Sequence, residues 1–193
     1  MENIVVKDNF LTDIDKDEIE KLLTSNYFPW FITEERNRTS PLEDISVLNK
    51  SGFKNTSLIK ESPQFCHMFY DNVTNSISNY HKVVDELLLK LDVHNDIIRA
   101  KANYLSQNNS FTKDNFHTPH IDFKVKHKVV LYYVNNSDGD TLFFDKDGNI
   151  INRIEPKKGR CIIFDGNILH ASQNPINWQD RIVINIDLQD EKN

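Results

Sequence analysis

From residue 97 to residue 188 the sequence is a succession of short apolar segments, which restricts the folds open to this chain. Candidate strands occupy residues 97–105, 119–124, 128–134, 141–145, 150–155, 160–164 and 181–188. Gly139, Gly148, Gly159 and Gly166 lie between these segments, where tight turns need a positive φ. Many short strands joined by turns predict a barrel or jelly roll.

The first half of the chain has a helical pattern instead. Capping residues at positions 11–15 precede Ile19, Leu22 and Leu23, which predicts a helix near residues 13–25. Apolar residues at three- and four-residue steps predict a longer amphipathic helix over residues 68–91, and the polar stretch 31–64 predicts a loop. Helices followed by strands indicate an α+β fold.

Length and composition exclude several classes of protein. A chain of 193 residues is long enough for one domain with a sizeable core. The net charge of −6 argues against binding driven by nucleic-acid phosphates, although a base could still be a substrate. Cys66 and Cys161 are too few for a disulfide framework or a zinc finger. No signal peptide or membrane-length apolar run is apparent, which predicts a cytoplasmic protein.

Three residues of the strand region have the composition of a metal site. His120 and Asp122 are two positions apart, so in a strand their side chains point to the same face. His170 follows a later strand candidate. Two imidazoles and one carboxylate form the ligand set that leaves one face of Fe(II) open, so we expect these three residues to bind iron. Zinc with a bound water, as in a hydrolase, is the alternative.

Arg181 favours an iron oxygenase over a zinc hydrolase. It begins the alternating strand 181–188, and its planar guanidinium can hold a carboxylate through two parallel hydrogen bonds. A carboxylate co-substrate needs such an anchor beside the metal, whereas a zinc hydrolase does not.

The first and last strand candidates each separate a polar from an apolar face. We expect the apolar faces to pack on the N-terminal helices and the polar faces to line the active-site mouth. In that case Arg99 and Lys101 could contact an acidic or polar substrate. The polar faces carry Arg99, Lys101 and Asn103, and then Arg181, Val183 and Asn185; the apolar faces carry Ile98, Ala100 and Ala102, and then Ile182, Ile184, Ile186 and Leu188.

These residues resemble the Fe(II)/2-oxoglutarate-dependent dioxygenases of the prolyl-hydroxylase-like branch. The stretch 119–122 is similar to the family's Pro-His-x-Asp motif, and residues 139–143 to its Gly-Gly-x-Thr-x-Phe segment, with Asp140 in the position before Thr141. Residues 26–31 are similar to phage and marine members. The resemblance implies that residues 97–188 form a double-stranded β-helix catalytic core. Residues 1–96 would form a helical support region packed on its larger sheet, within a single domain over 1–193.

The resemblance also implies a role for individual residues. His120, Asp122 and His170 would bind iron, and Arg181 would hold the distal carboxylate of 2-oxoglutarate. The same end of the co-substrate would contact Tyr133 and Thr141, and either Asn103, by strand parity, or Tyr104, by residue type.

Two segments near the motif have no settled role. Residues 106–118 are longer than in the family and would form a lid, a substrate loop or a disordered insertion. His117, three positions before His120, is a further candidate for substrate contact or for support of the metal site.

The implied reaction is hydroxylation of a peptide side chain such as proline, or of a small metabolite, with release of succinate and CO2. Fe(II), 2-oxoglutarate and O2 would be required, with ascorbate as a further candidate. Asp122 favours hydroxylation, because halogenating relatives lack this carboxylate. The alternatives are oxidative demethylation of a nucleic-acid base, which the acidic charge disfavours, and a non-catalytic jelly-roll binding module. Neither nucleic acid nor membrane is expected as a partner, and the sequence does not indicate an oligomeric state.

Overall fold

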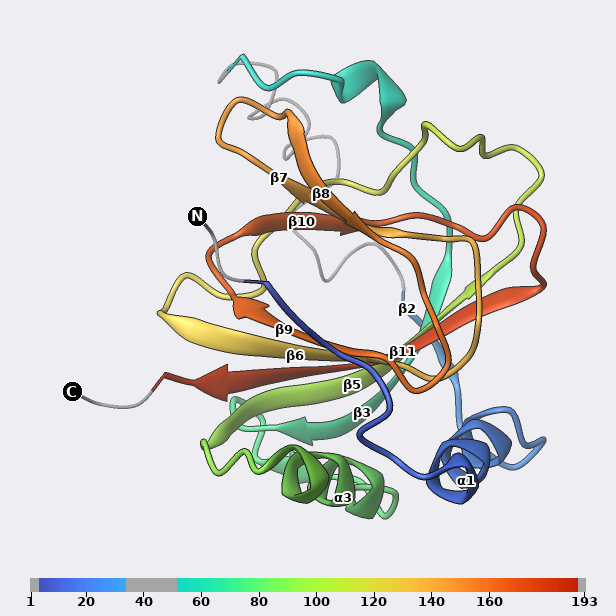
Figure 1. The fold of residues 1–193 in the computed structure, drawn as a ribbon, viewed down its shortest axis with the longest axis vertical. Coiled ribbons are helices and arrows are strands. Elements are labelled where there is room, and N and C mark those ends of the chain that lie inside the picture. The colour runs from blue at the N-terminus through green and yellow to red at the C-terminus, as the bar shows by residue number, and fades with distance from the viewer. Residues whose placement is uncertain (1–3, 34–51, 191–193) are drawn as a thin grey trace.

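The computed structural model describes residues 4–33 and 52–190, which form two antiparallel β-sheets and two α-helices (Figure 1). The large sheet has eight strands in the order β1-β9-β6-β11-β5-β3-β2, with β4 paired to β3. The small sheet has three strands in the order β10-β7-β8. This mostly β architecture is consistent with the jelly-roll prediction.

The bounds of the elements are as follows. The large sheet contains β1 (Val5–Lys7), β2 (Phe31–Thr33), β3 (Gln64–Asp71), β4 (Ser76–Ile77), β5 (Ile97–Ser106), β6 (His127–Tyr133), β9 (Cys161–Asp165) and β11 (Asp180–Gln189). The small sheet contains β7 (Thr141–Phe144), β8 (Ile150–Ile154) and β10 (Leu169–Ser172). The helices are α1 (Asp13–Leu23), α3 (Lys82–Leu91) and the short 3-10 helix η2 (Thr56–Leu58).

Both α-helices cover the face of the large sheet that points away from the small sheet (Figure 1). A capping box starts α1, in which the Thr12 hydroxyl accepts from the Asp15 N–H and the Asp15 carboxylate accepts from the Thr12 N–H. The helices bury their apolar faces against β5, β6 and β11, and residues on β11 at this interface include Ile182, Ile184 and Ile186. Ala100 and Ala102 of β5 lie at this interface too, and Ile97 takes the place that strand parity predicts for Ile98.

A second apolar cluster fills the space between the two sheets. It joins Val129, Leu131 and Tyr133 of β6 to Phe143 of β7 and Val183 of β11, all of them buried. A third cluster surrounds Phe116 and includes Phe53, Leu142, Phe144 and Ala171. Phe111 and Phe116 are buried, whereas most other residues of the 106–118 stretch are exposed, so this segment contacts the core through a few side chains; its predicted role as a lid, a substrate loop or an insertion stays a prediction.

Other predicted elements differ from the structure. The helix predicted over 68–91 exists only as α3, since residues 64–71 form β3, which pairs with β5. Val73 and Ile77, which fit the helical spacing, are 82 and 65% exposed beside the β3–β4 turn. The predicted strand 119–124 has no ladder, whereas β10 was not among the predicted strands. The predicted loop 31–64 contains β2 and η2, and its residues 34–51 lie outside the described part.

Within the described ranges, no helix combines the length and the apolar character needed to cross a membrane.

Two leucines of α3 provide a test of this packing. Leu87 is 1% exposed and belongs to the helix–sheet core, whereas Leu89 is 71% exposed. Leu87→Ala should lower the free energy of unfolding by about 2–5 kcal/mol, because it leaves a cavity in a packed core. Leu89→Ala, the same change two residues away, should alter it by less than about 0.5 kcal/mol. Equal midpoint shifts for the two variants in urea denaturation would contradict this arrangement.

Candidate active site

His120 and His170 face each other through their backbones. The N–H of each donates to the carbonyl of the other at 3.0 Å, which makes an isolated antiparallel bridge. The strand β10, which carries His170, is held in turn by its pairing with β7. The two imidazole rings therefore lie side by side, with centroids 4.9 Å apart, although they come from distant parts of the sequence.

Each of these histidines has one ring nitrogen tied to a backbone carbonyl. Nδ1 of His120 lies 3.0 Å from the Thr118 carbonyl, and Nδ1 of His170 lies 3.0 Å from the Ile168 carbonyl. A carbonyl can only accept, so Nδ1 donates in both rings and Nε2 is the atom through which each ring could bind a metal. Hydrogen bonds of this kind orient metal-binding histidines.

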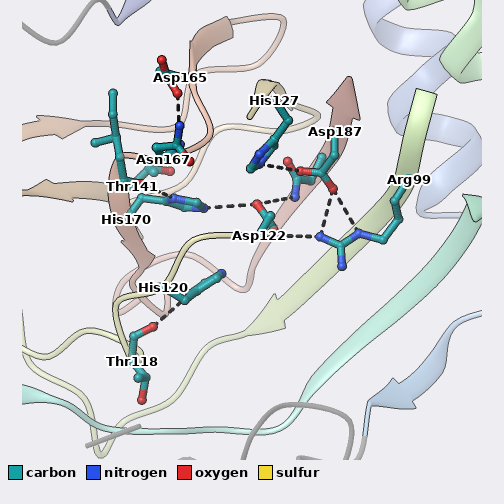
Figure 2. Close-up of polar contacts among 12 residues, drawn as sticks. Arg99, Thr118, His120, Asp122, His127, Thr141, Asp165, Asn167, His170 and Asp187 are labelled. Atoms are coloured by element: carbon teal, nitrogen blue, oxygen red, sulfur yellow. Dashed lines mark hydrogen bonds and ion pairs between the residues drawn. The ribbon is translucent and has the colours of Figure 1, made fainter. Parts of the chain in front are cut away.

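Asp122 completes the group. Its side chain is 4% exposed, and Oδ2 lies 3.4 Å from Nε2 of His170 and accepts from Asn185 at 3.3 Å (Figure 2). One ligand atom from each of His120, Asp122 and His170 lies within 4.8 Å of the others. Among the described residues this is the one cluster of three or more such side chains able to hold a metal ion.

The electrostatics of this group favour a bound cation. Burial alone would raise the pKa of Asp122, but the hydrogen bond and charge of His170, with the charges of Lys101 and His120, hold it well below its usual value. Burial lowers the pKa of His170, but Asp122 raises it overall. The carboxylate thus stays ionised, and a proton on His170 or a metal ion would add to the positive charge that Arg99 and Lys101 already supply.

The other oxygen of Asp122 is held by Arg99 rather than by the rest of the ligand group. Arg99 donates to Asp122 Oδ1 at 2.5 Å and to Asp187 Oδ2 at 3.0 Å from Nε and 2.9 Å from the terminal nitrogen (Figure 2). Burial, together with the charge of Asp122, raises the pKa of Asp187 to about 7, although Arg99 and Lys101 act in the opposite direction. The prediction that Arg99 contacts a substrate therefore finds no support, because these carboxylates engage it.

Arg181 is buried at the same cavity, with 3% of its surface exposed. Nε donates to the Gly139 carbonyl at 2.6 Å, and a terminal nitrogen donates to Thr141 Oγ1 at 2.8 Å. The Tyr133 hydroxyl also donates to Thr141 Oγ1, at 2.7 Å. Burial lowers the pKa of Arg181, and the neighbouring Tyr133 and Asp140 offset this only in part. No carboxylate of the described residues forms an ion pair with Arg181, so an anionic ligand would neutralise a costly buried charge.

One cavity contains both the group His120, Asp122 and His170 and the side chain of Arg181. Its lining shows which of the predicted co-substrate residues can reach a ligand. Asn103 lines the cavity, and its Oδ1 is buried without a hydrogen-bond partner. Tyr104 lies on the opposite face of β5 against Trp30 and Phe65, so of the two candidates only Asn103 can reach a ligand there. The cavity is lined by Gln64, Lys101, Asn103, Leu105, His120, Asp122, Leu131, Thr141, Phe164, His170, Ala171, Ser172, Arg181, Val183 and Asn185.

A buried ion pair that sequence reasoning missed fixes the segment before His120. Glu61 accepts from Nδ1 of His117 at 2.9 Å and from the N–H and hydroxyl of Thr118, both at 2.7 Å. Nε2 of His117 lies 2.7 Å from Asn174 Oδ1, so both ring nitrogens face acceptors. His117 therefore helps to fix the chain just before His120, which agrees with the second of its two predicted roles, support of the metal site. Glu61 carries no motif, so only the fold identifies it.

Residues 102–186 match the family model of the 2OG-Fe(II) oxygenase superfamily. No curated protein matches the sequence. Among solved structures, a 2OG-Fe(II) oxygenase family oxidoreductase from Burkholderia pseudomallei has a TM-score of 0.64 at 10% identity, covering 96% of this chain and 85% of that one.

Two prolyl hydroxylases are also similar in fold. The viral collagen prolyl hydroxylase of Paramecium Bursaria Chlorella virus-1, solved with 2OG, has a TM-score of 0.53 at 16% identity, with 95 and 94% of the two chains covered. The prolyl hydroxylase of Trichoplax adhaerens, solved with a peptide of hypoxia inducible factor, has a TM-score of 0.53 at 12% identity, with 97 and 84% covered. At these identities the likeness establishes a shared fold.

The Glu61 contacts predict a specific dependence of stability on acid. Burial would raise the pKa of Glu61, but His117 and Thr118 lower it from 4.5 to about 2. The stabilisation is present above pH 4.5 and disappears as the pH falls toward 2, and it amounts to about 3 kcal/mol at most. Glu61→Gln should therefore lower the free energy of unfolding at pH 7 and lose this deficit in acid. Urea denaturation at several pH values measures the difference.

Glu86→Gln, on the exposed side of α3, is the control and should follow the parent protein at every pH. A deficit of Glu61→Gln that stays constant from pH 7 to pH 3 would exclude the ion pair as its cause.

Proposed function

We propose that this chain, whose residues 102–186 belong to the 2OG-Fe(II) oxygenase superfamily, is an Fe(II)- and 2-oxoglutarate-dependent dioxygenase that hydroxylates an organic substrate. In this proposal the two sheets form the double-stranded β-helix of the superfamily. Residues 97–188 are the catalytic core of a single domain over 1–193, and residues 1–96 support it. A cytoplasmic location and a use for ascorbate stay predictions.

The observation that carries the proposal is the pairing of two sites in one cavity. One is the set His120, Asp122 and His170, which each bring one possible ligand atom within 4.8 Å of the others, while Nδ1 of both histidines faces a backbone carbonyl. The other is the buried Arg181, whose guanidinium has no carboxylate partner among the described residues and lies beside Thr141. A metal site alone would suit a zinc hydrolase, but such an enzyme has no use for a buried carboxylate anchor.

We assign the roles of the residues from this arrangement. The Nε2 atoms of His120 and His170 and a carboxylate oxygen of Asp122 hold Fe(II), and Arg181 holds the distal carboxylate of 2-oxoglutarate. Tyr133 and Thr141 fix the guanidinium, and Asn103 lies within reach of the co-substrate. When bound, iron and 2-oxoglutarate supply the oxidising chemistry by which O2 is split between the substrate, as a hydroxyl group, and succinate, with loss of CO2.

Part of the cavity wall is apolar. Leu105, Leu131, Phe164 and Val183 are buried lining residues, and Leu105 lies directly opposite Arg181 in the β5–β11 register, so these side chains limit the access of water to the cavity. Charge-assisted hydrogen bonds are stronger in such surroundings, which favours one orientation of a dicarboxylate.

For the substrate we propose a peptide side chain, proline among the candidates, or a small metabolite. The Trichoplax adhaerens protein binds a peptide and the viral protein is a collagen prolyl hydroxylase, and both share this fold. Oxidation of a nucleic-acid base has no comparable support here, and a binding module without catalysis would not need the complete set of ligands.

The metal ligands provide the first test. His120→Ala, Asp122→Ala and His170→Ala should each abolish Fe(II)-dependent formation of succinate from 2-oxoglutarate, because the three residues bind the ion jointly. Titration with Fe(II) under anaerobic conditions should show the loss of binding directly. His94→Ala, at an exposed histidine paired with Asp92, is the control and should behave as the parent does. Parental turnover by Asp122→Ala would refute the metal assignment, as would a zinc-dependent hydrolase that ignores 2-oxoglutarate.

Arg181 provides the second test. Arg181→Ala should raise the Kd for 2-oxoglutarate about tenfold to a hundredfold, since a charge-assisted hydrogen bond contributes about 1.5–3 kcal/mol. Arg181→Lys should be intermediate, because it keeps the charge and loses the planar fork. Tyr133→Phe should cause a smaller loss, and the affinity for Fe(II) should change little in all three. Unchanged 2-oxoglutarate binding by Arg181→Ala in calorimetric titration would show that the co-substrate assignment is wrong.

A further inference from the structure

Asp122 is the one proposed ligand that lies neither in a strand nor in a backbone bridge. His170 lies on β10, and His120 makes the backbone bridge to His170. Residues 121–126, which include Asp122, form neither strand nor bridge. The orientation of this carboxylate therefore depends on contacts of its own side chain.

Arg99 makes the shortest of these contacts. Its own position is fixed by Asp187 and by the ring of Phe123. It lies directly opposite Asp187 in the β5–β11 register and donates to Asp187 Oδ2 through two nitrogens, at 3.0 and 2.9 Å. Its guanidinium lies 4.6 Å from the centre of the Phe123 ring, next to Asp122 in the chain. The Asp187 side chain is fully buried, and Nε2 of His127 lies 3.9 Å from its other oxygen (Figure 2).

The two oxygens of Asp122 consequently have different surroundings. Oδ1 accepts from Arg99 at 2.5 Å, whereas Oδ2 lies on the side of His170 and Asn185, at 3.4 and 3.3 Å. A hydrogen-bonded, charge-paired oxygen is a poor additional ligand, because coordination would require it to give up the guanidinium.

We propose that Arg99 is a positioning residue that restricts Asp122 to one metal–oxygen bond, through Oδ2, and so keeps a position on iron open for O2. Two histidines and one carboxylate oxygen fill three of six positions, and the 2-oxoglutarate chelate fills two more. A carboxylate bound through both oxygens would occupy the last one. The inference rests on the proposed function and adds to it a residue that is not itself a ligand.

Removal of Arg99 should therefore separate three binding events. In Arg99→Gln, Fe(II) should bind as tightly as in the parent or more tightly, since both oxygens of Asp122 become available. 2-Oxoglutarate should bind within a few-fold of the parent, because Arg181 is intact. Nitric oxide, which serves as a probe of the O2 position on the anaerobic Fe(II)–2-oxoglutarate protein, should bind at least about tenfold more weakly, and succinate formation should fall in parallel.

Further variants separate positioning from folding. Arg99→Gln leaves two buried carboxylates without their cation, which can destabilise the protein. The double variant Arg99→Gln/Asp187→Asn removes this excess charge and should show the same selective loss of nitric oxide binding. Asp187→Asn alone keeps the contact between Arg99 and Asp122 and should bind nitric oxide nearly as the parent does, and Arg99→Lys should recover part of the loss.

The matched control is Arg160→Gln. Arg160 is also 20% exposed and also pairs with a carboxylate through two nitrogens, at 2.9 and 3.0 Å from Asp8, but Asp8 is not a proposed metal ligand. Arg160→Gln should leave the binding constants for Fe(II), 2-oxoglutarate and nitric oxide unchanged. If the double variant bound Fe(II), 2-oxoglutarate and nitric oxide all more weakly, the proposal would be overturned and Arg99 would have a structural role only. Unchanged nitric oxide binding would also overturn the proposal. A parent protein that does not bind 2-oxoglutarate would instead refute the proposed function.

Discussion

The alternation of side chains along β11 is the constraint on which the rest of this site depends. The strand pairs with β5 on one side and β6 on the other, so its register is fixed on both edges. Its even-numbered residues enter the core beneath α1 and α3. The opposite face presents Arg181 to the cavity, Asn185 to Asp122, and Asp187 to Arg99. A shift of one residue would exchange these faces, so stability and chemistry depend on the same register.

Much of this arrangement could be predicted from local patterns. The spacing of His120 and Asp122, the later His170 and the parity of β11 all depend on short stretches of sequence, and the structure brings those side chains to one cavity. The helix predicted over residues 68–91 was wrong in its first half, because the spacing of apolar residues contains no information on long-range strand pairing. The backbone there makes its hydrogen bonds in β3, which pairs with β5. Asp122 also lies outside any strand, so the i, i+2 reasoning assumed a geometry that the segment does not adopt, and it is the fold that brings His120 and Asp122 to one cavity.

The contacts of Glu61 and Arg99 could not be predicted, for a different reason. Each joins residues far apart in the sequence, Glu61 to His117 and Arg99 to Asp187. Neither has a spacing that marks it. A charged residue on an alternating strand is compatible with a rim salt bridge or a substrate contact, and only the three-dimensional position of its partner decides. Burial of the charges then determines how strongly each pair constrains its neighbours.

The distribution of burial along the cavity also indicates how a substrate would approach. Arg181, Thr141, Leu105 and Val183 are buried, and the backbone at Gly139 lies so close to that of Gln173 that an added Cβ would be 2.4 Å from its carbonyl oxygen. That end is therefore closed. The partly exposed lining residues are Gln64 of β3, Lys101 and Asn103 of β5, His120, and Ser172 of β10. A co-substrate anchored at Arg181 would fill the closed end, so a substrate would have to reach the metal from this polar side, past β3 and β5.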